Sequence, residues 1–282
     1  MVLVLVLTLL AGAAGAEMKI LASFYPVYIL TLNLTQGVPG VTVENLVPAT
    51  TGCLHDYSLQ TRDMARIEKA DVLVINGGGM GQFRDRVAGV SGLAVIEAAA
   101  GIPMTDSSEE GFLNSHVWMD PALAAREAEN IAAGLEAADP ENAKAYRDNL
   151  EDLKGRLASL DGEIREMLRP FEGREIVIFH EAMTYFAQAY GLKVAGIIAT
   201  EPGEEPSTRD IARTCDMVKR LGIRELFTEP QYPQTAAQTI ARETGARIYV
   251  LDPVVSGDGT PGSYEAALRE DARVLKEALG GE

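Results

Sequence analysis

The sequence predicts an α/β protein of two lobes, each with a mostly parallel sheet flanked by helices, joined by one long backbone helix. Strand-like and helical patterns alternate through both halves of the 282-residue chain, and one long helical stripe separates the halves. Alternating strands and helices favour parallel sheets covered by helices. We expect a signal peptide over 1–16, an N-terminal lobe over 17–139, a linking helix over 140–170 and a C-terminal lobe over 171–282.

The N-terminal lobe begins with a strand and alternates from there. Its predicted strands are short apolar runs at Lys19–Ser23, Thr42–Val47, Val72–Ile75 and Ala94–Ile96. Helical spacing of apolar residues predicts helices near Pro26–Thr35, Gln60–Ala70 and Gln82–Val90, and a further helix after Pro121.

The linking helix is predicted from an unbroken stripe of apolar residues. The stripe recurs in steps of three and four at Ala143, Tyr146, Leu150, Leu153, Leu157, Leu160, Ile164 and Met167. Asp139-Pro140 is a typical helix start and Pro170 a typical stop. About 30 residues at a rise of 1.5 Å would span about 45 Å, the length of a whole domain. The helix can therefore act as a rigid connection between two lobes.

The C-terminal lobe repeats the alternation of the first. Its predicted strands are Ile176–Phe179, Lys193–Ile197, Glu225–Phe227 and Arg247–Leu251. Its predicted helices are near Ala182–Tyr190, Thr208–Leu221, Gln234–Thr244 and Tyr264–Leu279.

Composition limits the location and the partners of the protein. Val2 to Ala16 form a short apolar run that ends in small residues, which is typical of a secretory signal peptide. Leu10-Ala-Gly-Ala13 is similar to a bacterial lipobox but has alanine where the lipidated cysteine would stand. We therefore expect an exported protein at the periplasmic or extracellular face of the membrane, with its mode of attachment open. A net charge of −16 argues against nucleic acid as a partner.

The chain has three histidines, and each lies at the end of a predicted element. His55 follows a strand, His116 precedes a helix, and His180 ends the run Glu175-Ile-Val-Ile-Phe-His180. Element ends are where α/β proteins place groups that contact ligands. Three imidazoles converging on one point would favour zinc or a neighbouring transition metal.

Two other motifs have competing interpretations. Gly77-Gly-Gly-Met-Gly81 lacks the spacing of a phosphate-binding loop, so we interpret it as a tight turn beside the cleft. Cys53 and Cys215 allow one disulfide, but two separate small apolar residues are an equally good interpretation.

Four segments together resemble the zinc and manganese solute receptors of ABC transporters, known as cluster A-I or cluster 9. They are Leu46-Val-Pro with His55-Asp-Tyr, Ser115-His-Val-Trp-Met-Asp-Pro121, Phe179-His-Glu-Ala-Met-Thr-Tyr-Phe186, and Phe227-Thr-Glu-Pro-Gln-Tyr232 followed by Leu251-Asp-Pro253. The resemblance implies that His55, His116, His180 and Asp252 bind a metal ion between the lobes, with no catalytic residue and no resident cofactor. It also implies a membrane permease as partner, and we expect a monomer.

The resemblance implies zinc as the ligand, because zinc receptors have histidine at the third ligand position and manganese receptors have glutamate. His180 stands at that position. Imidazole nitrogen suits zinc, whereas a carboxylate-rich set suits manganese. A manganese or iron receptor is the alternative, and a surface adhesin of the family is a weaker one. The acidic segment Thr105–Gly111 stands where many zinc receptors carry a histidine-rich loop.

Several neighbouring side chains are candidates for supporting roles. Glu229 is the chief rival of Asp252, although we expect it to accept a hydrogen bond from a ligand imidazole instead. Asp56, Asp120 and Glu181 could orient imidazoles in the same way, while Trp118 and Tyr185 are expected to pack in the core or the cleft wall.

A secreted metallohydrolase is the competing class of function. His180-Glu-Ala-Met-Thr184 begins like a zinc-protease motif but has threonine at the position of the second histidine. Four protein ligands would also fill the coordination of zinc and leave no position for a catalytic water. We therefore predict a receptor and not an enzyme.

Overall fold

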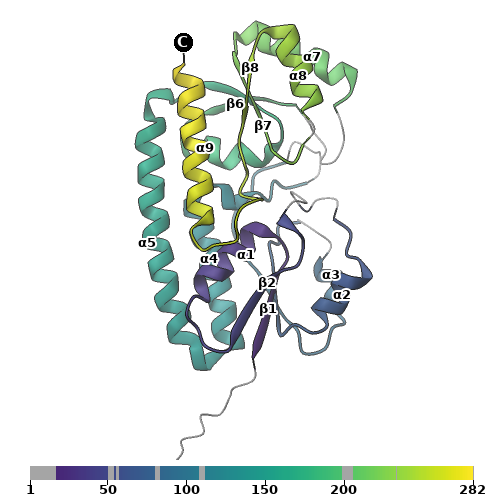
Figure 1. The fold of residues 1–282 in the computed structure, drawn as a ribbon, viewed down its shortest axis with the longest axis vertical. Helices are drawn as coiled ribbons and strands as arrows, with labels where there is room; N and C mark the ends of the chain where they lie inside the picture. The colour runs from purple at the N-terminus through teal and green to yellow at the C-terminus, as the bar shows by residue number, and fades with distance from the viewer. Residues whose placement is uncertain are drawn as a thin grey trace, which may run out of the picture.

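A computed structural model describes residues 17–49, 54, 57–79, 83–107, 112–198, 206–232 and 234–281. The chain forms two α/β lobes, one above the other, with a long helix along one side of both (Figure 1). The predicted fold class is therefore confirmed. The signal peptide expected over 1–16 lies outside the described residues.

The N-terminal lobe is built on a parallel sheet with the strand order β2-β1-β3-β4. The strands are β1 (Met18–Ala22), β2 (Val41–Asn45), β3 (Val72–Ile75) and β4 (Ala94–Glu97). The helices are α1 (Tyr25–Leu34), α2 (Thr61–Ile67), α3 (Phe83–Val87) and α4 (Pro121–Ala138). All four residues of β3 are buried, as expected for a central parallel strand covered on both faces.

The C-terminal lobe has an equivalent parallel sheet with the order β6-β5-β7-β8. Its strands are β5 (Glu175–Ile178), β6 (Lys193–Ile197), β7 (Glu225–Thr228) and β8 (Arg247–Val250). Its helices are α6 (Thr184–Ala189), α7 (Thr208–Leu221), α8 (Thr235–Thr244) and α9 (Ser263–Gly280). Gly222 and Gly245 end α7 and α8 in left-handed backbone conformations that glycine adopts without steric cost.

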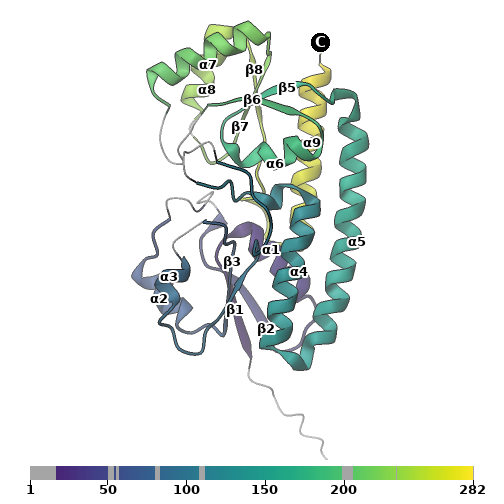
Figure 2. The ribbon, with the colours of Figure 1, turned by 180° about the vertical axis from the view of Figure 1, so that it is seen from behind.

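The linking helix is α5 (Ala143–Leu168), and it runs past both lobes (Figures 1 and 2). Its 26 residues span about 39 Å at 1.5 Å per residue, less than the predicted length. The reason is that the two ends of the predicted range, Pro140–Asn142 and Arg169–Phe171, form tighter 3-10 turns. The predicted stripe is the buried face, with Tyr146, Leu153, Leu157, Leu160 and Ile164 all buried.

Helix α4 packs within the N-terminal lobe and against α5. It begins at Pro121 behind the capping residue Asp120, runs to Ala138, and packs along α5. Gly134 lets α4 approach the sheet, since a β-carbon there would lie 2.6 Å from the Ile96 side chain. The sequence predicted a helix after Pro121 but not where it ends, because the buried face of α4 mixes three alanines with Glu127 and only two large aliphatic residues.

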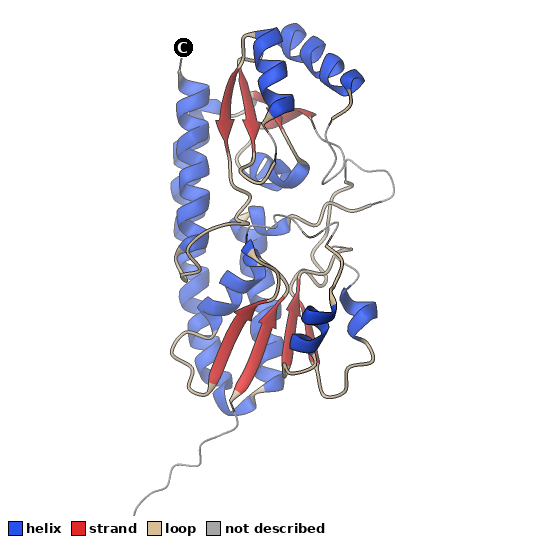
Figure 3. Cartoon of the chain, turned by 45° about the vertical axis from the view of Figure 1, so that its right-hand side comes forward, coloured by secondary structure: helices blue, strands red, loops and turns tan. Residues whose placement is uncertain are grey.

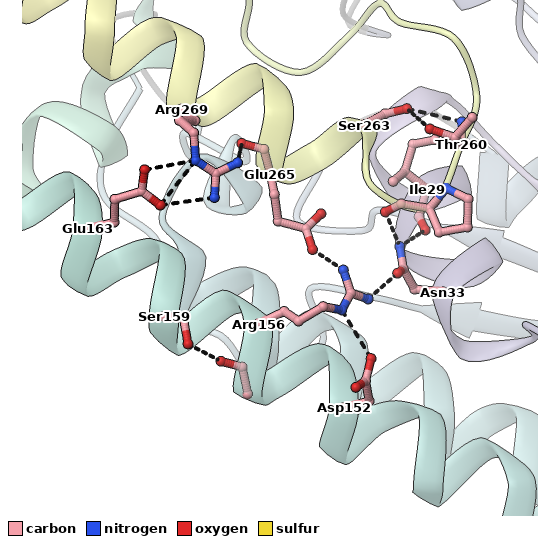
Figure 4. Close-up of polar contacts among 12 residues, drawn as sticks. Ile29, Asn33, Asp152, Arg156, Ser159, Glu163, Thr260, Ser263, Glu265 and Arg269 are labelled. Carbon is pink, nitrogen blue, oxygen red and sulfur yellow. Dashed lines mark hydrogen bonds and ion pairs between the residues drawn. The ribbon is translucent and has the colours of Figure 1, made fainter.

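Charged side chains fasten α9 to α5 and α1 at the junction of the lobes (Figure 4). Arg156 of α5 donates hydrogen bonds to Glu265 in the first turn of α9 and to Asn33 of α1. Asn33 also donates to the carbonyl of Pro261 at 2.8 Å, and Arg269 of α9 pairs with a Glu163 oxygen of α5 at 2.9 Å. These contacts hold the segment after β8 against the first lobe.

The remaining differences from the predicted elements are confined to their ends, where hydrogen bonding is least regular. The helix predicted over Gln60–Ala70 is Thr61–Ile67, and that predicted over Gln82–Val90 is Phe83–Val87. In the part of the chain that the structure describes, none of the helices is both long and apolar enough to cross a membrane.

Candidate metal site

The strands of the two sheets point toward each other, so their carboxyl ends meet at the junction of the lobes (Figure 3). His180 follows β5, Glu229 follows β7 and Asp252 follows β8, and these three strands are neighbours in the sheet. Ligands of open α/β sheets bind at the carboxyl ends of the strands. The topology alone therefore gathers these polar side chains on one side of the junction.

His116 and His180 face each other across the junction. Their ring centroids are 4.9 Å apart, the ring planes lie at 82°, and the residues are 0% and 2% exposed. The structure thus brings together two of the predicted ligands, one from each lobe. His55 lies outside the described residues, as do Cys53 and Asp56.

His116 is oriented by Asn114, two residues earlier. The Asn114 side-chain oxygen lies 2.8 Å from His116 Nδ1 and accepts a hydrogen bond from the His116 backbone N–H at 3.1 Å. Because an amide oxygen can only accept, Nδ1 carries the proton and Nε2 is the ring nitrogen with the lone pair. A metal-binding imidazole needs this arrangement, with one nitrogen donated to a neighbour and the other available to the ion.

The turn after β3 supports the segment that carries His116. Asn76 donates a hydrogen bond to the carbonyl of Ser115 at 3.0 Å. Gly78 has φ +65°, and a β-carbon there would lie 2.2 Å from Met104 Cε and 3.3 Å from Ser115 Cβ. A side chain there would have to displace the end of Met104 and adopt a left-handed backbone conformation that glycine takes without steric cost. The glycine-rich turn therefore abuts the junction, as predicted.

Glu229 lies beside His180, at a separation longer than the hydrogen bond expected between them. Its carboxylate oxygen Oε1 lies 3.6 Å from His180 Nδ1, and both side chains are 2% exposed. Oε2 accepts a hydrogen bond from Gln231 at 2.5 Å. A buried carboxylate beside Nδ1 favours the tautomer in which Nδ1 carries the proton. The lone pair of the neutral ring is then on Nε2.

Asp252 lies in a tight turn beside the same cluster. Its carboxylate accepts hydrogen bonds from the Val255 N–H at 2.9 Å and from the Ser256 hydroxyl. The next carbonyl, of Pro253, accepts from Trp118 Nε1 at 2.8 Å, and the Trp118 ring is centred 5.1 Å from that of His116. Val254 is buried with φ +58°, a strained conformation for a β-branched residue.

The two imidazoles and Asp252 do not yet form a complete coordination sphere. Within the described residues alone, no three His, Cys, Asp or Glu side chains lie close enough together to hold a metal ion. The described part of the site is therefore an imidazole pair with its supporting groups, and the Asp252 carboxylate is engaged in its own turn.

Two of the predicted imidazole-orienting residues have other contacts. The Asp120 carboxylate caps α4 by accepting from the Ala122 N–H at 2.8 Å, and burial raises its pKa. The Glu181 carboxylate accepts from the Ser107 hydroxyl at 2.8 Å, which joins the lobes. Trp118 and Tyr185 are buried in the walls of the junction, as predicted.

Asn114 was not among the residues predicted from the sequence. It donates from its amide to the Glu181 carbonyl at 3.2 Å as well as accepting from His116. Its position two residues before His116, a predicted ligand, was the available signal, because a side chain there can reach the imidazole. A single asparagine in a loop has many possible roles, so spacing alone did not single it out.

Comparisons with known proteins find a family and relatives that match most of this chain. The family model described as ZnuA, zinc-uptake complex component A periplasmic, matches residues 20–278. The high-affinity zinc uptake system protein ZnuA of Bacillus subtilis (strain 168) is 28% identical over 258 residues, covering 86% of this chain and 80% of that protein.

Two solved structures are similar over nearly the whole chain. The solute-binding protein FpvC of Pseudomonas aeruginosa in complex with Mn²⁺ has a TM-score of 0.83 and 29% identity, covering 94% of this chain and 98% of that one. A ZnuA deletion mutant with zinc bound has a TM-score of 0.81 and 28% identity, covering 93% and 98%.

Proposed function

Since the chain belongs to the ZnuA family of periplasmic zinc-uptake components, we propose that it captures Zn²⁺ between its lobes and delivers it to the permease of an ABC transporter. The observation that carries the proposal is the buried imidazole pair His116 and His180, one from each lobe, with ring centroids 4.9 Å apart. Imidazole nitrogen is a preferred ligand of zinc.

The proposed ligands are His55, His116, His180 and Asp252. Three neutral imidazoles and one carboxylate would complete a tetrahedral zinc site with no position left for water. Support for Asp252 comes from its place after β8 and from the contact of the adjoining Pro253 with Trp118. Binding then requires the Asp252 carboxylate to approach the imidazole pair, a local rearrangement in the strained turn around Val254.

Manganese is the alternative ligand, and one observation bears on it directly. The residue after β5 that faces the junction is a histidine, and the nearby carboxylate of Glu229 lies beside the imidazole. A site that presents three imidazole nitrogens and one carboxylate to the ion, with the Glu229 carboxylate behind His180, suits zinc better than manganese, which prefers oxygen ligands. Zinc is therefore the proposed cargo.

The protein is a receptor and not an enzyme, in keeping with its family. The backbone at His180 also differs from that of a zinc-protease helix. His180 is extended, Glu181–Met183 form a 3-10 turn, and the α-helix begins only at Thr184. Residues 180 and 184 therefore do not share one face of an α-helix, as the two histidines of that protease motif must.

We propose an exported monomer whose lobes move little when the ion binds. The division into an N-terminal lobe over 17–139, a linking helix over 140–170 and a C-terminal lobe over 171–282 is supported by the two separate sheets and by α5 between them. Helix α5 contacts α4, α9 and α1, so a wide swing of one lobe would break packing along its whole length.

Isothermal titration of the chelator-stripped protein with zinc and with manganese tests the proposed function. We expect one zinc site per chain with a clear preference over manganese, and a loss of at least about 100-fold in zinc affinity in His180→Ala. Glu141→Ala, which removes an exposed acidic side chain, is the matched control and should bind as the wild type does. Equal affinity for manganese, or an unaffected His180→Ala variant, would contradict the proposal.

A further inference from the structure

We propose that Asn114 is a positioning residue that holds His116 in the metal-binding tautomer and ties it to the loop that carries His180. The inference rests on the proposed function, because it concerns the same site. Asn114 is 1% exposed, and its side chain and backbone contact both halves of that site. Asn114 is not one of the proposed ligands and acts through the two histidine segments.

The hydrogen bonds around Asn114 fix the orientation of its amide. One terminal atom faces two groups of His116, the backbone N–H at 3.1 Å and ring Nδ1 at 2.8 Å. The other faces the carbonyl of Glu181 at 3.2 Å. A backbone N–H requires an acceptor and a carbonyl requires a donor, so the oxygen faces His116 and the nitrogen faces Glu181.

This orientation determines the protonation of the imidazole. With an amide oxygen 2.8 Å away, Nδ1 of the neutral ring is protonated and Nε2 has the lone pair. The isolated imidazole has no such constraint and exchanges its proton between the two nitrogens. Asn114 therefore removes the tautomer that would present an N–H group to an incoming cation.

The same residue connects the ligands of the two lobes. Its amide donates to Glu181, the residue directly after His180. Its backbone carbonyl accepts from the Tyr185 hydroxyl at 2.8 Å, and that hydroxyl accepts from the Thr105 N–H at 3.0 Å. The Asn114 side chain therefore does two things: it orients His116, and it holds the loop that carries His180 against the first lobe. A displacement of either loop would alter both ligands together.

Asparagine makes both sets of contacts, and neither aspartate nor alanine at position 114 would keep both. Aspartate would keep an oxygen for the two N–H groups of His116 but would lose the donor to the Glu181 carbonyl. Alanine would lose both contacts, leaving a buried Nδ1–H without its acceptor. The two substitutions therefore separate the tautomer role from the interlobe contact.

The first experiment needs no substitution of Asn114. Long-range proton–nitrogen NMR of the metal-free protein labelled with ¹⁵N reports the tautomer of each imidazole, and the chain has only three histidines. The His116 signals are assigned by their loss in His116→Gln. We expect the Nδ1-protonated form, and an Nε2-protonated His116 would overturn the inference whether or not the protein binds zinc.

The second experiment measures zinc affinity by competition with a chromophoric chelator. We expect Asn114→Ala to bind zinc about 10- to 100-fold more weakly and to lose the dominant Nδ1–H tautomer, because groups that orient ligand histidines contribute by that factor. Asn114→Asp should retain the tautomer and recover most of the affinity. Asn130→Ala, which removes amide contacts to Ala98 and Ala100 away from the site, is the matched control.

A folded Asn114→Ala variant with wild-type affinity or an unchanged tautomer would overturn the inference, as would an Asn114→Asp variant no better than alanine. Failure of the proposed function has a different signature. In that case the wild-type protein itself would not bind zinc, while the tautomer of metal-free His116 would still show what Asn114 does.

Discussion

Glu127 of α4 is a buried carboxyl whose ionisation should make the stability of the protein depend on pH. The residue is 0% exposed, and neither carboxyl oxygen has a hydrogen-bond partner among the described residues. Burial raises its pKa from 4.5 to about 8, because no neighbouring group compensates for the lost hydration of the charged form. The carboxyl is therefore neutral in the folded protein at pH 7.

The direction and size of the effect follow from the two pKa values. Below pH 4.5 the carboxyl is neutral in both folded and unfolded chains and costs no ionisation energy. Between pH 4.5 and 8 the unfolded chain loses the proton that the folded protein retains, so the free energy of unfolding falls by about 1.4 kcal/mol per pH unit. At pH 7 the loss amounts to about 3 kcal/mol, and it levels off above pH 8.

Urea denaturation of the wild type and Glu127→Gln at pH 5, 6, 7 and 8 measures this effect. Glutamine keeps the shape of the side chain but cannot ionise, so the stability of the wild type relative to the variant should decline steadily with pH. Glu141→Gln, at an exposed position, is the matched control and should give a flat difference. A flat difference for Glu127→Gln as well would refute the reasoning.

Three further predictions concern the junction. Trp118→Phe leaves the Pro253 carbonyl without its donor and should lower the free energy of unfolding in urea by about 1–3 kcal/mol; unchanged stability would mean that the bond contributes nothing. Glu229→Gln should weaken zinc binding in chelator competition by about 10- to 100-fold through His180, and wild-type affinity would argue against that role. Free zinc at about 100 times its Kd should stabilise the folded protein by about 2.7 kcal/mol over the chelator-treated sample, seen as a higher Tm that is absent with excess chelator.

Much of the fold could be predicted because the determining signals are local. The fully buried β3 is a continuous apolar run, and the buried face of α5 is an uninterrupted stripe of large residues. Helix α4 was harder to delimit, since three of its buried residues are alanines and one is the charged residue type Glu127, which weakens the apolar stripe. Its contact with Ile96 through Gly134 exists only in three dimensions.

Some residues of the candidate site could likewise be predicted from local sequence signals, and others could not. The placement of His180 and Glu229 near each other at the junction could be predicted because each follows a strand of one sheet. The role of Asn114 depends on a contact with Glu181 in the other lobe, 67 residues away, which no local pattern encodes. Asp120 was predicted only as a possible imidazole contact, and in the structure its carboxylate caps α4.

Anomalous diffraction at the zinc edge from crystals of the zinc-loaded protein tests the central claim most directly. We predict one strong peak between the imidazoles of His116 and His180, about 2.0–2.1 Å from a nitrogen of each, with His55 and Asp252 completing a tetrahedron. A zinc peak elsewhere, or one that touches only a single imidazole, would contradict the account.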